Sequence, residues 1–233
     1  MRLVNVPVPD TRHSVHAVVT AQPVGPDVPS PVPLPTPALL RRFGADREQL
    51  DGLAARPHVQ VLHRTGPTAS AATDAVAARL EALTIAAQHD GLVIDLAVPR
   101  FVTHPLEATD PTIAKQWVAM DLAPATETSL DIVSHGLATF GLPELRASAV
   151  GPASLPAGIA LLTGLAHRLL VEWPQNDPVG PATITLDDVA AGLGEPGLGD
   201  AESAPSSGVR ISLDLVAEEL AVTFLDDPVT LFG

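Results

Sequence analysis

The segment 135–145 reads HGLATFGLPEL and lies between two strand-like stretches, 128–134 and 145–150. It contains two glycines, one proline, one histidine and one glutamate. Glycine adopts positive φ angles that other residues avoid, and proline has no backbone N–H to donate. We therefore predict a tight connection between two strands, with Gly136 and Gly141 at positive φ.

The ionisable side chains of this segment allow two interpretations. If the turn folds back, Glu144 can orient the imidazole of His135, as a carboxylate does beside a ligating or catalytic histidine. We favour the alternative, in which the pair holds the turn together and Phe140 enters the core. Asp131, Ser134 and His135 are the residue types of a hydrolytic triad. Neighbouring strand residues face opposite sides, however, so Ser134 and His135 are not expected to hydrogen-bond.

Asp95 lies within the apolar stretch Leu92–Leu96. Burying a carboxylate costs free energy unless it is paired or hydrogen-bonded. Asp95 is therefore either an acid, base or ligand contact at a sheet edge, or a cap for nearby backbone N–H groups, which we favour. If the chain is an enzyme, the candidate catalytic residues are His135, Glu144 and Asp95.

Other motifs do not support a cofactor or a metal, and we expect neither. Residues 192–197 match G-x-G-x-x-G, but a Pro/Ser-rich stretch follows where a dinucleotide site needs a helix. There is no P-loop, no G-x-S-x-G and no H-E-x-x-H sequence. His13 and His16 have H-x-x-H spacing, but on the strand expected there they point to opposite faces. We interpret them as two surface histidines.

The composition narrows the classes of partner. The net charge of −14 disfavours nucleic acids and anionic membranes, and an acidic surface suits a basic protein partner. No cysteine is present, which excludes disulfides and thiolate metal sites. The first ten residues show no apolar signal-peptide region, and the uncharged stretch 147–166 is interrupted by prolines. We expect a cytoplasmic protein that binds neither nucleic acid nor membrane.

The order of expected elements predicts an α+β fold. Strands and helices alternate early and strands cluster later, which favours a single domain, 1–233, with a mostly antiparallel sheet and two principal helices on one face. Whether the chain divides at 121–127 is left open. We expect a proline-rich extended strap at 22–37 and a mobile loop at 192–208. The expected strands are 13–19, 58–63, 92–96, 116–122, 128–134, 145–150, 183–186, 209–215 and 220–225. The expected helices are 38–55, broken or bent near Gly44, 69–89 and 154–170.

The segment 135–145 also resembles a signature in uncharacterised bacterial proteins of the domain-of-unknown-function type. In that signature a strand runs into His-Gly-Leu-x-x-Phe-Gly-x-Pro-Glu/Asp-Leu and a leucine-rich helix follows, here 159–170. The stretch 77–95, an Ala/Leu helix entering Gly-Leu-Val-Ile-Asp, resembles a second part of those proteins. The resemblance implies no activity, and because some relatives are accessory or immunity-like proteins, it favours interaction over catalysis.

Three functions follow from these observations. The leading hypothesis is a non-enzymatic, acidic protein-interaction or accessory module that has a protein partner or forms a homo-oligomer. The alternative is a small-molecule-binding protein or hydrolase with a site around His135, Glu144 and Asp95, and it requires these three side chains to converge. The third is a structural subunit of an oligomer, which requires a large apolar patch on an open sheet face.

Overall fold

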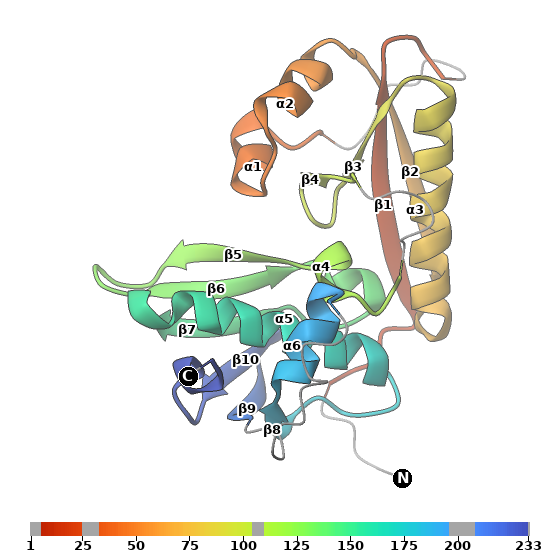
Figure 1. Cartoon of the computed structure of the whole chain (residues 1–233). Coiled ribbons are helices and arrows are strands. Elements are labelled where there is room, and N and C mark those ends of the chain that lie inside the picture. Colours follow the sequence, from red (N-terminus) through yellow and green to blue (C-terminus); the bar gives the residue numbers. More distant parts are fainter. Residues whose placement is uncertain (1–5, 25–32, 104–109, 196–207, 233) are drawn as a thin grey trace. The chain divides into compact units, whose positions relative to one another are not determined.

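The computed structural model describes residues 6–24, 33–103, 110–195 and 208–232 (Figure 1). Both helices and sheets make up a substantial part of the structure, which confirms the α+β class. Contacts divide the chain into an N-terminal unit, 10–110, and a C-terminal unit, which combines 1–9 with 111–233. Each unit has its own sheet and its own long helix. The single sheet with two principal helices expected from the sequence is therefore replaced by two sheets.

The N-terminal unit is a four-stranded antiparallel sheet with helices on both faces (Figure 1). Alternate residues of its inner strand point to opposite faces. Val18 packs with the long helix, whereas Ala17 and Val19 pack with Leu40 and Leu50 of the two short helices. The strands, in spatial order, are β2 (His58–Pro67), β1 (Thr11–Thr20), β3 (Leu92–Asp95) and β4 (Arg100–Phe101), and the helices are α1 (Pro37–Arg42), α2 (Arg47–Ala54), η1 (Thr68–Ser70) and α3 (Ala71–Gln88).

The helix expected at 38–55 is broken near Gly44, as one of the two expectations had it, and forms the separate helices α1 and α2. Gly44 adopts φ +92°, which ends the first helix. Asp46 then caps the second, because its side chain accepts from the Gln49 backbone N–H while the Gln49 side chain accepts from the Asp46 N–H. In the strap expected at 22–37, residues 25–32 lie outside the described residues and Pro37 is the first residue of α1.

The C-terminal unit is a six-stranded mixed sheet. All its strand pairs are antiparallel except β7 and β10, which are parallel. Gly158 of α5 lies against Ile132 and Phe224, so this helix covers one face. The strands, in spatial order, are β5 (Ala119–Pro124), β6 (Leu130–His135), β7 (Leu145–Val150), β10 (Glu219–Phe224), β9 (Val209–Val216) and β8 (Gly180–Ile184), and the helices are α4 (Ala114–Trp117), η3 (Leu137–Phe140), η4 (Pro152–Ser154), α5 (Leu155–Glu172), α6 (Leu186–Leu193) and η5 (Pro228–Leu231).

Two expectations in this unit were wrong. The strand expected at 116–122 begins only at Ala119, because the preceding residues form α4. The sequence did not predict α6, which begins with a capping box between Thr185 and Asp188. The G-x-G-x-x-G match thus starts inside α6, and Gly194 ends that helix at φ +73°. In the loop expected at 192–208, residues 196–207 lie outside the described residues.

The segment Pro152–Glu172, which contains α5, is the one helical stretch among the described residues that is long and apolar enough to cross a membrane. Half of its most apolar window is buried inside the protein. The core helix of a soluble protein meets the same criteria, so this finding is weak evidence for a membrane span. The expected cytoplasmic location stays a prediction.

Helices α5 and α6 approach each other at two glycines. A Cβ atom on Gly164 would lie 2.9 Å from the Val189 backbone nitrogen, and one on Gly192 would lie 2.6 Å from the Thr163 carbonyl oxygen. Real Cβ atoms do not come this close to backbone atoms. The contact therefore requires glycine on both helices.

We predict that Gly164→Ala destabilises the protein by about 1–3 kcal/mol, because the added methyl group forces the two helices apart. Urea unfolding followed by circular dichroism measures the change in free energy of unfolding. Gly151→Ala is the matched control, since its Cβ would meet nothing within 4 Å, and it should change stability by less than about 0.5 kcal/mol. Equal effects of the two substitutions would contradict the close-packing argument.

Candidate functional site

The connection between β6 and β7 has the predicted backbone geometry. Gly136 and Gly141 adopt φ +117° and +75°, and η3 lies between them. Phe140 is buried and meets the edge of Trp117, with ring centroids 5.5 Å apart. The predicted positive φ angles and the buried phenylalanine are confirmed.

The carboxylate of Glu144 closes this connection. Its Oε1 accepts hydrogen bonds from the backbone N–H groups of Gly136 (2.9 Å) and Ala138 (3.1 Å), and its Oε2 accepts from Ser134 Oγ (2.5 Å). Ser134 Oγ in turn accepts from the Leu145 N–H at 2.7 Å. Glu144 therefore holds the turn, as favoured from the sequence, but it does so with Ser134 and the backbone.

His135 lies in a different environment. Its Nε2 is 3.6 Å from Oδ2 of Asp121, which lies on β5 two residues after Ala119, the residue paired with His135. Ser134 is fully buried whereas His135 is partly exposed, so the two residues face opposite sides of the strand as expected. Asp131 contacts Arg146 and the Ala149 N–H. The members of the triad pattern thus have separate partners.

Arg146 joins three strands through its two carboxylate partners. It donates to Asp131 of β6 (3.1 Å) and to Glu219 of β10 (2.5 Å). The hydrogen bond to Glu219 is the main cause that raises the pKa of Arg146, and the charge of Glu219 and the hydrogen bond and charge of Asp131 add to it. The hydrogen bond from Arg146 lowers the pKa of Glu219. Asp131, Arg146 and Glu219 form a row across the three strands. With two carboxylates on one guanidinium, this row carries a net charge of about −1 at neutral pH.

A groove of about 390 Å³ lies beside this row. The parallel pairing of β7 with β10 forms it, because this pairing brings 146–154 next to 221–228. Sequence reasoning missed the groove, since no local pattern shows which strands pair. Its described lining residues are Arg146, Ser148, Ala149, Val150, Gly151, Ser154, Ala221, Val222, Thr223, Phe224 and Pro228.

Asp95, the third candidate, belongs to the N-terminal unit and is buried. Its Oδ1 accepts from the backbone N–H groups of Ala97 (3.0 Å) and Val98 (3.2 Å), which is the favoured capping role. Its Oδ2 accepts from Arg79 of α3 at 2.9 Å. The guanidinium and the capped N–H groups together compensate the burial of this carboxylate.

His16 was expected at the surface, but its side chain is buried with 2% exposed. It lies on the α3 face of β1, opposite Asp95 of β3, and β1 is an inner strand. Neither ring nitrogen has a hydrogen-bond partner among the described residues. Burial lowers the pKa of His16, and the charge of Asp95 opposes this only in part. The ring is therefore neutral at pH 7.

The three candidate catalytic residues consequently have three different sets of contacts. Glu144 and Asp95 accept hydrogen bonds that hold local structure, and His135 lies beside Asp121. No group of three or more His, Cys, Asp or Glu side chains that could hold a metal ion occurs within the described ranges.

Comparison with known proteins assigns neither a family nor a function to this chain. No family model, no curated protein and no solved structure matches this chain. The resemblance of 135–145 to domain-of-unknown-function proteins stays a prediction.

We predict that Glu144→Ala destabilises the protein by roughly 2–4 kcal/mol, because Ser134 and two backbone N–H groups lose a charged acceptor. Urea unfolding again measures the change. His135→Ala is the control and should cost less than about 1 kcal/mol, since the exposed contact with Asp121 contributes little. A larger loss in the control than in Glu144→Ala would refute the turn-holding role.

We predict that acid destabilises the protein through His16. Because the folded pKa of His16 is lowered, the unfolded state binds the proton first as the pH falls below 6.5. Stability is then lost at up to about 1.4 kcal/mol per pH unit. His16→Leu should reduce the difference in free energy of unfolding between pH 7 and pH 5, while His58→Gln should keep it. An unchanged pH dependence in His16→Leu would disprove the assignment.

Proposed function

We propose that this chain is a non-enzymatic, acidic protein-interaction module whose C-terminal unit binds an extended basic segment of a partner protein. The groove between 146–154 and 221–228 is the observation that carries the proposal. It is large enough for one or two side chains of a peptide and is partly open to solvent.

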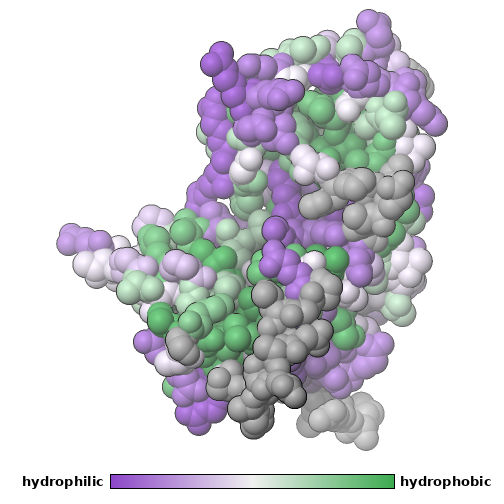
Figure 2. Space-filling model, viewed as in Figure 1, coloured by the Kyte–Doolittle hydropathy of each residue, from purple (hydrophilic) through white to green (hydrophobic). Residues whose placement is uncertain are grey.

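The chemistry of the groove suits an apolar anchor side chain. Its walls include the apolar residues Val150, Phe224 and Pro228, and two serines and one threonine are also among its lining residues. Beyond the groove, Leu225 and Val229 expose 51% and 43% of their surface. Figure 2 shows hydrophobic residues gathered over the first half of α5, the helix that begins at this groove. An apolar partner side chain would bury this surface.

Charge favours a basic partner. The chain has a net charge of −14, which attracts a cationic segment over long distances. Arg146 is the one charged residue among the described residues that line the groove, and Asp131 and Glu219 neutralise it. A lysine or arginine of the partner therefore meets no uncompensated positive side chain at this row.

The contacts of the candidate catalytic residues support interaction over catalysis. Glu144 and Asp95 each accept two backbone hydrogen bonds and one side-chain hydrogen bond. A carboxylate that is engaged in this way holds structure and is poorly placed to exchange protons with a substrate.

Selection from a random peptide library displayed on phage tests this proposal. We expect the full chain to enrich peptides that combine Lys or Arg with a large apolar residue, and binding should weaken as salt rises. Thr223→Trp, which fills the groove, should weaken binding of the selected peptides at least tenfold, or about 1.4 kcal/mol. Thr128→Trp, at another exposed threonine, in the β5–β6 turn, should leave affinity unchanged.

Two results would overturn the proposal. One is enrichment of acidic peptides or of none. The other is peptides that bind Thr223→Trp as tightly as they bind the unmodified chain, because their site would then lie elsewhere.

A further inference from the structure

Two histidines from neighbouring strands meet on the surface of the N-terminal unit. His13 Nδ1 on β1 is 2.9 Å from His63 Nε2 on β2. The ring centroids are 5.1 Å apart and the ring planes are inclined by 22°. Thr65 Oγ1 is also close, at 3.1 Å from His13 Nδ1. Two imidazole nitrogens and one hydroxyl oxygen thus lie together.

The strand register fixes this arrangement. His13 is paired with Thr65, and His63 is paired with Val15 two residues along, so the histidines are diagonal neighbours on one face. The pairing of β1 with β2 runs unbroken from Thr11 to Thr20, which holds the two backbones at a constant separation. The side-chain positions are therefore set by the sheet.

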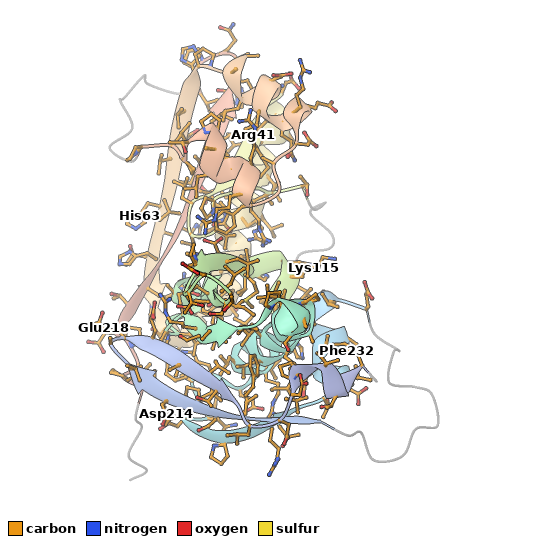
Figure 3. All side chains as sticks on the ribbon, turned by 90° about the vertical axis from the view of Figure 1, so that its left-hand side faces the viewer. Arg41, His63, Lys115, Asp214, Glu218 and Phe232 are labelled. Carbon is orange, nitrogen blue, oxygen red and sulfur yellow. The ribbon has the colours of Figure 1, made fainter. Side chains whose placement is uncertain are left out.

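Both histidines are accessible to solvent. His13, His63 and Thr65 are all exposed, and Figure 3 shows His63 projecting from the edge strand β2. On the other face of β1, Arg12 and His16 are buried. Solvent can reach the histidine pair, and the two rings have room to turn.

We propose that His13 and His63 form a binding site for a divalent transition metal ion, with Zn²⁺ as the ion it takes. Neutral imidazole nitrogen is a preferred ligand of zinc, at about 2.0–2.1 Å. Two such nitrogens on a tetrahedral ion are about 3.3 Å apart. The 2.9 Å separation therefore has to open by only about 0.4 Å, and the rings have to turn until both lone pairs point at the ion.

The remaining coordination positions are filled by water. A full set of protein ligands is not present, since no group of three or more His, Cys, Asp or Glu side chains is found in the part of the chain that the structure describes. The Thr65 hydroxyl is placed to hydrogen-bond a metal-bound water, as outer partners do in zinc sites. The site keeps open positions and resembles a catalytic zinc site in this respect only.

Zinc bound here clamps two strands of one sheet. The ion binds only when β1 and β2 are paired, so it stabilises the folded state by mass action. The site lies in the N-terminal unit and shares no residue with the groove of the C-terminal unit.

Isothermal titration of the full chain with ZnCl₂ in a non-chelating buffer is the test. We expect saturable binding of one ion, weakened at least about tenfold in His13→Ala and in His63→Ala. His58→Ala is the matched control, because His58 lies on β2 like His63 but on the other face of that strand. The His58→Ala variant should bind zinc as tightly as the unmodified chain does. Circular dichroism of each variant checks that the fold is intact, as we expect for substitutions at exposed positions.

A thermal melt supplies a second readout. Zinc should raise the melting temperature of the unmodified chain and of His58→Ala, but not that of His13→Ala or His63→Ala. Absence of saturable binding, or equal affinity in the His13→Ala, His63→Ala and His58→Ala variants, would overturn the proposal.

Discussion

Glu144 is the residue on which the C-terminal sheet depends. Its carboxylate accepts from Gly136, Ala138 and Ser134, which fixes the connection between β6 and β7. Its backbone carbonyl accepts from the Leu220 N–H at 2.8 Å, which starts the parallel pairing of β7 with β10. The groove at the far end of these two strands exists because this pairing brings their chain segments together. One residue therefore sets both the turn and the strand register that forms the proposed binding surface.

The near absence of aromatic residues, 3% of the chain, explains how the helices pack. Without large rings to fill space, helices must come close to their neighbours. Gly164 and Gly192 allow this between α5 and α6. In the N-terminal unit a stripe of buried alanines serves the same purpose on α3, and long side chains such as Arg79 fill the space that remains. Because the Arg79 guanidinium is buried away from water, its ion pair with Asp95 is needed to compensate the lost solvation of both charges.

The features that were predictable from the sequence are local. The glycines at 136 and 141, the buried Phe140 and the α+β class follow from short-range patterns of glycine, proline and apolar residues. Other features depend on distant pairing. No local pattern shows that β7 lies beside β10, that the strands form two sheets, or that Asp95 meets Arg79. The helix α6 was missed because it has only eight residues after its N-cap Thr185, and several of them have small side chains.

The H-x-x-H spacing of His13 and His16 shows that the secondary structure of a motif decides which of its side chains can bind one ion. On a helix the two rings would share a face, but on β1 they are separated by the sheet. His16 lies under α3, where burial keeps it neutral and makes it a source of acid sensitivity. His13 lies in solvent and meets His63, a residue fifty positions away that the cross-strand register brings beside it. The metal site that the motif suggests can therefore form only across strands, with His63 in place of His16.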